Sequence, residues 1–504
     1  MRAHEAGAMH GEIGHHGPSW LRPPADVNAL LDHLWSANAH RGADGVLTVG
    51  GVDVETLAEE YGTPAYLLDE DDFRDRCRAY QTAFQGADVY YAGKAFLCKA
   101  VVRILAEEGL GLDVCTGGEL AVALAADFPP ERLGLHGNNK SVAELTRALR
   151  AGVGRIIVDS YDEIDRLAAL AADLGVRPKV MVRVTVGVEA HTHEYIATAH
   201  EDQKFGFSLA NGAGRESGGG AGRSGAGAAK PGDLPAGATG QGGAAGSGPG
   251  GAAGEAVRRI LATPHLELVG LHSHIGSQIF DTSAFEVAAR RVLGLHAAIR
   301  DEHAVELPEL DLGGGFGIAY TTQDDPLGPD DIARQLTKIV EHECAGYGLA
   351  VPRLSVEPGR SIVGPSVCTL YQVGTVKDIA LDAGATRRYV SVDGGISDNI
   401  RAALYDASYS CTLASRASDA PPVLTRVVGK HCEAGDVVVK DEFLPADVEP
   451  GDLVAVPGTG AYCRSMASNY NHVPRPPVVA VRDGAARVVV RRETEDDLLA
   501  LDVG

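Results

Sequence analysis

The chain has 504 residues, more than a single domain usually holds, so we expect two domains or a large barrel with an appendage. It carries 68 acidic against 45 basic residues, a formal net charge of -23. Because such a charge repels nucleic acid and anionic lipid, we expect no nucleic-acid or membrane partner and infer a protein that acts on small molecules.

The N-terminal region gives no sign of a targeting or membrane segment. No apolar stretch approaches the roughly 20 residues that span a bilayer, so we expect a cytoplasmic location. Residues 1–45 lack periodicity and predict a mobile tail, whose histidines we do not expect to bind a metal. The eight cysteines form no C-x-x-C pair and indicate reduced thiols. Residues 46–70 contain short β-like runs that we assign to a β-domain formed mainly by the C-terminal part.

Residues 71–363 alternate short β-rich runs with amphipathic helical stretches, the pattern of parallel strands joined by crossover helices. Helical spacing of apolar residues marks stretches such as 99–109, 141–152, 161–175, 284–302 and 329–343. The predicted strands are 87–93, 111–115, 132–137, 154–160, 179–186, 266–274, 307–315 and 352–358. Eight such units predict an α/β fold, a (β/α)8 TIM-type barrel, with a doubly wound open sheet as the alternative.

Two further regions differ from the barrel pattern. Residues 211–254 are dominated by Gly, Ala, Ser and Pro, cannot bury enough apolar surface to order, and predict a disordered insertion after the fifth barrel strand. Residues 364–504 contain β-branched runs separated by turn residues and predict a C-terminal all-β domain.

Polar residues gather at the C-terminal ends of the predicted strands, where the loops of a barrel form its active site. Each of them has an ordinary structural explanation, but their shared placement indicates one site. They are Lys94, Asp113, His136, Asn138, Lys140, Arg183, His272, His274, Ser277, Gly313, Gly314, Gly315, Glu357 and Arg360.

These residue types together suggest pyridoxal phosphate as cofactor. Glycine backbone with Ser277 and Arg360 can bind a phosphate, and an amine such as Lys94, partly desolvated, can form a Schiff base with an aldehyde. A flat imidazole such as His274 can cover an aromatic ring. A pyridoxal ring also needs a carboxylate partner for its nitrogen, which the set contains.

Several motifs resemble the pyridoxal-phosphate-dependent decarboxylases of the alanine-racemase fold. They are YYAGKAF (90–96), HSHIGSQIF (272–280), LGGGFGI (312–318), EPGRSIV (357–363), CEAGD (432–436) and GAYC (460–463). The resemblance covers about residues 90–470 apart from the insertion. Within this group, residues 190–209 and 397–409 are similar to the diaminopimelate decarboxylase family of the actinobacterial type.

The resemblance implies decarboxylation of meso-2,6-diaminopimelate to L-lysine and carbon dioxide, the last step of lysine biosynthesis. It implies that Lys94 carries the cofactor, His274 stacks on its ring and Glu357 pairs with the pyridine nitrogen. The implied cofactor-binding residues are Lys94, Asp113, His274, Ser277, Gly313, Gly314, Gly315, Glu357, Gly359, Arg360 and Tyr462. The implied substrate-binding residues are Arg360, Arg401, Tyr405, Glu433 and Tyr462.

The resemblance also implies a homodimer with shared active sites, because Cys432 matches a residue that reaches in from a second subunit and protonates the substrate carbon. Three alternatives stay open at this point. One is a decarboxylase for ornithine, arginine or lysine on the same fold, which the pairing of Arg401 with Glu433 disfavours. The others are a racemase, which Glu357 disfavours, and a non-catalytic homologue that binds the cofactor.

Overall fold

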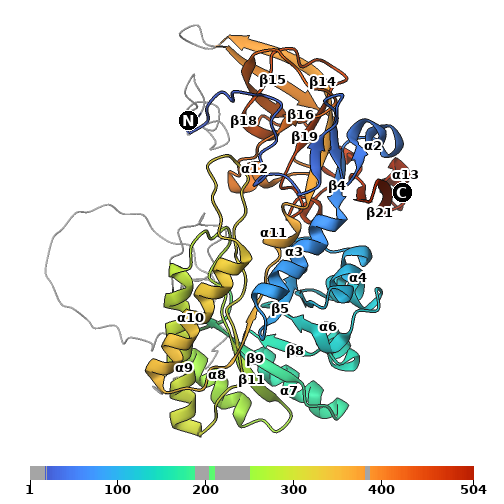
Figure 1. The fold of residues 1–504 in the computed structure, drawn as a ribbon. Coiled ribbons are helices and arrows are strands. Elements are labelled where there is room, and N and C mark those ends of the chain that lie inside the picture. The colour runs from blue at the N-terminus through green and yellow to red at the C-terminus, as the bar shows by residue number, and fades with distance from the viewer. Residues whose placement is uncertain (1–17, 19, 188–203, 210–249, 381–385) are drawn as a thin grey trace, which may run out of the picture.

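The computed structural model describes residues 18, 20–187, 204–209, 250–380 and 386–504 (Figure 1). Within these ranges the chain forms a barrel with surrounding helices and a second domain of mostly antiparallel strands. In Figure 1 the barrel occupies the lower part of the view and the strand domain the upper part. No described helix combines the length and the apolar character needed to cross a membrane.

Eight parallel strands close the barrel, because β13 pairs with β5 and β9 pairs with both β8 and β11. The predicted barrel fold is therefore confirmed. The barrel strands are β5 (Asp88–Ala92), β6 (Gly111–Val114), β7 (Leu133–Leu135), β8 (Arg155–Val158), β9 (Lys179–Thr185), β11 (Glu267–His272), β12 (Glu309–Asp311) and β13 (Arg353–Val356). A two-residue strand, β10 (Phe207–Ser208), adds to β9.

Helices cover the outside of the barrel and bury their apolar faces against its strands. Local signals set their ends: Ser141 and Glu144 form a capping box at the start of α6, and Gly152 ends it in a left-handed conformation with φ of 76°. The helices are α3 (Glu70–Ala83), α4 (Lys99–Glu107), α5 (Gly117–Leu124), α6 (Val142–Ala151), α7 (Tyr161–Leu174), α8 (Gly251–Leu261), α9 (Ser283–His303) and α10 (Pro329–Tyr347).

The second domain is built around β14, a strand long enough to take part in two pairings. Its first half pairs with β4 and β19, and its second half pairs with β15. The strands are β4 (Ala65–Asp69), β14 (Val367–Ala380), β15 (Thr386–Val392), β16 (Thr412–Leu413), β17 (Pro422–Val428), β18 (Val437–Pro445), β19 (Leu453–Val456), β20 (Val478–Arg482) and β21 (Ala485–Val490). Three short helices accompany them: α11 (Arg360–Val363), α12 (Arg401–Tyr405) and α13 (Glu495–Leu499).

The N-terminal part of the chain packs on this second domain. A small sheet of β1 (Ala39–Arg41), β2 (Leu47–Val49) and β3 (Val52–Asp53) precedes α2 (Val54–Tyr61). Leu34 and Trp35 are buried in the same hydrophobic cluster as Leu67 of β4. Leu21 is buried as well. The stretch assigned from sequence to a tail over residues 1–45 therefore contains a strand and buried side chains.

The predicted insertion at 211–254 lies outside the described residues up to position 249. Its last residues belong to the barrel, because Gly251 begins α8 and Ala253 and Gly254 are buried in that helix. Small residues let α8 pack closely against the barrel there. A run of small residues in residues 211–254 therefore indicates two things, the insertion and the first turn of a packed helix.

Candidate active site

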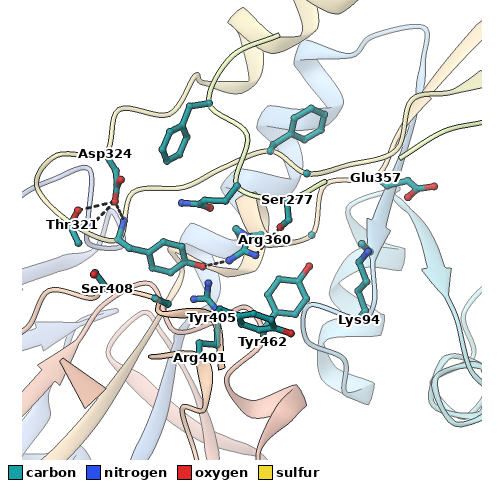
Figure 2. Close-up of a pocket in the computed structure, with 18 of the residues that line it drawn as sticks. Lys94, Ser277, Thr321, Asp324, Glu357, Arg360, Arg401, Tyr405, Ser408 and Tyr462 are labelled. Atoms are coloured by element: carbon teal, nitrogen blue, oxygen red, sulfur yellow. Dashed lines mark hydrogen bonds between the residues drawn. The ribbon is translucent and has the colours of Figure 1, made fainter. Parts of the chain in front are cut away.

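A cavity of about 530 Å³ lies where the mouth of the barrel meets the second domain (Figure 2). Figure 2 shows Lys94 and Glu357 at one side of it and Arg360, Arg401 and Tyr405 further along. A smaller cavity of about 150 Å³ adjoins it, and Lys94, His274 and Glu357 line both. Strand ends of the barrel and loops of the second domain thus converge on one site.

Lys94 follows β5 and extends into the cavity from a loop that is fixed on both sides. The Gly93 N–H donates to the Asp113 carbonyl at 2.9 Å, and the Ala95 carbonyl accepts the Tyr462 N–H at 2.9 Å. The side chain of Lys94 is exposed rather than desolvated among apolar groups, which corrects the expectation from sequence. Its amine is therefore accessible to an aldehyde in the cavity.

Glu357, at the end of β13, lies between two buried histidines. Its Oε1 is 3.2 Å from His136 Nε2 and 3.1 Å from His272 Nε2, and His136 Nε2 is also 3.3 Å from Asp113 Oδ1. Burial opposes ionisation of Glu357, but the two histidines outweigh it and hold its pKa well below its ordinary value. The carboxylate is therefore charged at neutral pH.

The charge on Glu357 also determines the state of its neighbours. Burial alone would lower the pKa of His136, but the Glu357 and Asp113 carboxylates raise it to about 9. Burial and the Glu357 charge raise the pKa of Asp113 to about 6. Burial lowers the pKa of His272. The cluster therefore contains a protonated His136 and a neutral His272 beside the Glu357 carboxylate.

His274 is held as a neutral ring beside the glycine loop that follows β12. Burial and the neighbouring Lys94 and Arg183 cations lower the pKa of His274 well below its ordinary value, and its Nδ1 accepts the Gly314 N–H at 3.2 Å. A Cβ on Gly314 would lie 2.1 Å from the Glu357 carbonyl oxygen, and Gly315 has a φ of 103°. Only glycine fits these two positions, which bring backbone close to the cavity.

Arg360 begins α11 and projects into the cavity beside Ser277. Its Nη2 donates to Ser277 Oγ at 2.9 Å, its Nη1 donates to the Tyr320 hydroxyl, and its guanidinium carbon lies 4.8 Å from the centre of the Tyr462 ring. Gly359, directly before it, packs against Ala92 of β5. A cation, a hydroxyl and close backbone therefore face the same part of the cavity.

Arg401, the first residue of α12, is buried at the edge of the cavity. Its Nη1 donates to the Tyr409 hydroxyl, and its guanidinium carbon lies 4.6 Å from the centre of the Tyr320 ring. Tyr405, one helical turn later, lines the cavity with its ring and contacts Met466 through its hydroxyl. Among the described residues, no carboxylate lies within ion-pair distance of Arg360 or Arg401.

Cys432 and Glu433 lie outside this site. Both are exposed on the loop between β17 and β18, and the Glu433 carboxylate accepts the Tyr470 hydroxyl. The linings of the two cavities, as far as the described residues form them, contain neither. The structure of one chain thus brings together the cofactor-binding residues predicted from sequence, with Arg401 and Tyr405, but not these two.

The residues around the two cavities fit pyridoxal phosphate. An accessible amine, an ionised carboxylate and a neutral flat imidazole meet where the cavities join. Backbone of Gly315 and Gly359, the Ser277 hydroxyl and the Arg360 cation supply donors for a phosphate nearby. Asp113 lines the smaller cavity next to His136 and belongs to the charged cluster behind the site.

Sequence reasoning missed several residues that shape the larger cavity. Tyr320 contacts both arginines, Tyr409 contacts Arg401, and Asp324 fixes the loop that carries Tyr320. Tyr320 lies in the loop after a barrel strand, and that position was the available signal for it. His136 and His272 were identified at strand ends, but their contacts with Glu357 were not foreseen.

Comparison with known proteins agrees with this chemistry. The family described as "Pyridoxal-dependent decarboxylase, pyridoxal binding domain" matches residues 70–216 and 248–364. The diaminopimelate decarboxylase of Mycobacterium tuberculosis (strain ATCC 25618 / H37Rv) is 55% identical over 482 residues, covering 94% of this chain and 98% of that protein. The one from Mycobacterium leprae (strain TN) is 52% identical over 510 residues and covers 100% of both chains.

A solved structure extends the likeness to three dimensions. The crystal structure of diaminopimelate decarboxylase from M. jannaschii in complex with L-lysine is similar to this chain, with a TM-score of 0.79 and 29% identity, over 94% of this chain and 99% of that one. The chain belongs to the pyridoxal-dependent decarboxylases and, within them, to the diaminopimelate decarboxylase family of the actinobacterial type.

Proposed function

We propose that the chain removes carbon dioxide from meso-2,6-diaminopimelate to give L-lysine, the last step of lysine biosynthesis, with pyridoxal phosphate as cofactor. One observation on the cavity itself supports this substrate, in addition to the family membership. The cavity beside Lys94 and Glu357 contains two arginines, Arg360 and Arg401, that no described carboxylate neutralises. A ligand with more than one anionic group matches such a cavity, because a buried guanidinium needs an anion. The proposed location is the cytoplasm.

When bound, pyridoxal phosphate supplies an electron sink for the carbanion that remains after carbon dioxide leaves. The chain's own residues would hold and orient it. Lys94 would present its amine, and the ionised Glu357 would present a carboxylate able to keep a proton on the ring nitrogen. His274 presents a flat neutral face. The Ser277 hydroxyl and Arg360 would bind the phosphate.

Substrate choice would depend on the far end of the cavity. Arg401 and Tyr405 would bind the distal carboxylate of diaminopimelate, and Glu433 would bind the distal amine. Because Glu433 and Cys432 are exposed and outside the cavity of their own chain, we propose that they serve the cavity of a second copy. The proposed assembly is a homodimer with shared sites, in which Cys432 gives the proton that replaces the lost carboxylate.

The alternatives predict different substrates. L-lysine and L-ornithine have no distal carboxylate, so decarboxylating them would leave Arg401 buried without an anion, which costs binding energy. A non-catalytic homologue would release carbon dioxide from none of the amino acids.

A substrate panel tests the proposal. Purified holoenzyme is given meso-diaminopimelate, L-lysine, L-ornithine and L-arginine, and carbon dioxide and the amine product are measured. We expect kcat/KM to be about 10- to 150-fold higher for meso-diaminopimelate, since one charge-assisted pair contributes about 1.5–3 kcal/mol and about 1.4 kcal/mol corresponds to a factor of ten. Arg401→Met, which keeps side-chain length, should remove most of this preference. Equal rates on ornithine or lysine would contradict the proposal.

A further inference from the structure

Tyr320 lies between the two arginines of the cavity and contacts both. Its hydroxyl accepts a hydrogen bond from Arg360 Nη1, and its ring centre lies 4.6 Å from the guanidinium carbon of Arg401. It is 6% exposed. Figure 2 shows the two guanidinium groups close together in the cavity. The guanidinium carbon of Arg360 also lies 5.7 Å from the ring centre. The Tyr320 hydroxyl therefore contacts Arg360, and its ring lies close to both cations.

The backbone of Tyr320 is fixed at both of its polar groups. Its N–H donates to Asp324 Oδ2 at 2.9 Å, and the same oxygen accepts the Thr321 N–H and hydroxyl at 2.9 and 3.0 Å. Its carbonyl accepts the Ser410 N–H of the second domain at 3.0 Å. Tyr320 is thus held between a barrel loop and the second domain, and its ring has a defined position.

The two contacts of Tyr320 have a physical consequence for the arginines. Guanidinium groups that face one cavity repel each other, and among the described residues no carboxylate separates them. A carboxylate between them would neutralise the two guanidinium charges, which would then be unavailable to an anionic ligand. A phenol offers an oxygen acceptor to one cation and a π face to the other while leaving both charges available.

We propose that Tyr320 is a positioning residue that orients Arg360 toward the cofactor phosphate and Arg401 toward the distal carboxylate of the substrate. The second half of this inference rests on the proposed function. Of the two arginines, Tyr409 contacts Arg401: its hydroxyl accepts a hydrogen bond from Arg401 Nη1, and its ring packs edge-on against Tyr320 with centres 5.1 Å apart. The two tyrosines therefore provide matched variants, one for each arginine.

Two conservative variants test the contacts with the two arginines separately. Tyr320→Phe removes the acceptor for Arg360 and keeps the ring over Arg401. Tyr409→Phe removes an acceptor for Arg401, together with a 3.6 Å contact between the hydroxyl and Cys463 Sγ, and leaves the contacts of Arg360 in place. Holoenzyme is dialysed against graded pyridoxal phosphate, and the retained cofactor is measured by absorbance. Inhibition constants are measured for L-lysine and for cadaverine, which is L-lysine without its carboxylate.

For Tyr320→Phe we expect the dissociation constant of pyridoxal phosphate to rise about tenfold and the inhibition constant of lysine to rise less, since Arg360 belongs to both the expected cofactor-binding and the expected substrate-binding residues. For Tyr409→Phe we expect the lysine inhibition constant and the KM for meso-diaminopimelate to rise about tenfold, with cofactor affinity and cadaverine inhibition unchanged. Tyr320→Leu removes both contacts and should shift both quantities. If that variant does not fold, the two Phe variants decide alone.

Cofactor affinity in Tyr320→Phe equal to that of the wild type would overturn the inference, and so would equal shifts of both quantities in the two Phe variants. Failure of the proposed function looks different. If wild-type enzyme released no carbon dioxide from meso-diaminopimelate, that function would fall, while the cofactor affinity of Tyr320→Phe would still decide the contact with Arg360.

Discussion

At the scale of single residues, the charge on Glu357 is coupled to His136. Burial alone would disfavour both charged forms, yet each group stabilises the charge of the other at 3.2 Å. The pKa of His136 rises from its ordinary 6.5 to about 9, so the folded protein binds this proton more tightly than the unfolded chain does. The stability contributed by His136 is complete below pH 6.5 and is lost as the pH rises through about 9.

This coupling predicts a pH dependence that His136→Gln removes. The wild-type protein should lose up to about 3 kcal/mol of stability between pH 6.5 and 9 through this group, because one pKa unit corresponds to about 1.4 kcal/mol. In His136→Gln the loss over that range should be much smaller. Melting temperatures of holoenzyme, measured at half-unit steps of pH, check the slope.

The matched control for that experiment is His265→Gln, because His265 is exposed. Its melting temperature should follow the wild-type pH profile. A wild-type slope retained in His136→Gln would show that His136 does not hold an extra proton in the folded protein.

Site residues that lie in local motifs could be predicted from the sequence. Site residues that matter through contacts with distant segments could not. Lys94, Ser277 and Glu357 stand at strand ends, and a barrel brings strand ends together. Tyr320 and Tyr409 gain their importance from contacts with Arg360 and Arg401, which depend on how the two domains meet. No local periodicity encodes such a contact.

At the scale of elements, the loop between β17 and β18 is fixed although the side chains it presents are exposed. His431 Nε2 lies 2.9 Å from Ser397 Oγ, and its Nδ1 lies 3.1 Å from Asn471 Oδ1. The His431 N–H donates to Asp436 Oδ2 at 2.7 Å. These contacts give the next residue, Cys432, a defined position on the surface.

If Cys432 is the proton donor of a neighbouring site, loosening this loop should slow turnover. His431→Ala should lower kcat about tenfold or more, since small misplacements of a catalytic group cost up to about 100-fold, while bound cofactor keeps its absorbance. His431→Gln should recover part of the rate. Lys430→Ala, an exposed neighbour, is the control. An equal loss in Lys430→Ala, or none in His431→Ala, would contradict this role.

The Gly-rich insertion gives another prediction at this scale. Its composition cannot support a packed core, so replacing residues 211–249 by a short Gly-Ser linker should leave the melting temperature and kcat nearly unchanged. The replacement ends before Gly251, where α8 begins. A second variant, with residues 211–249 in scrambled order, shows whether any effect comes from the length of the insertion or from its sequence. A large loss of activity in the linker variant would assign the insertion a role in the site or in an interface.

Strong local periodicity made the helices and strands of the barrel predictable. Strand pairings between distant parts of the chain could not be predicted in this way. The eight strands and the amphipathic helices lie where their patterns indicate. The partners of the first half of β14 were not predictable, because β4 and β19 come from distant parts of the chain, whereas its second half pairs with β15, the next strand. The domain boundary between residues 363 and 364 stays a prediction.

At the scale of the whole molecule, the arrangement of Lys94 and Cys432 predicts complementation between chains. Lys94→Ala and Cys432→Ala should each be nearly inactive, for lack of the amine and of the proton donor. A mixed dimer would have one site with both lesions and one with neither. Random subunit exchange should therefore restore roughly a quarter of wild-type activity.

Mass measurement of the mixed dimer is the control, because it shows that exchange took place. Mixing each variant with itself under the same conditions should restore nothing. Confirmed exchange without any return of activity would mean that Lys94 and Cys432 do not meet across two chains.

Decarboxylation of meso-diaminopimelate by this protein is tested most directly by product stoichiometry. Purified wild-type holoenzyme is incubated with meso-diaminopimelate, and carbon dioxide and L-lysine are measured together over time. We expect one molecule of L-lysine for each carbon dioxide released, and no release from Lys94→Ala. Absence of release by the wild-type holoenzyme, or release with a product other than lysine, would contradict this expectation.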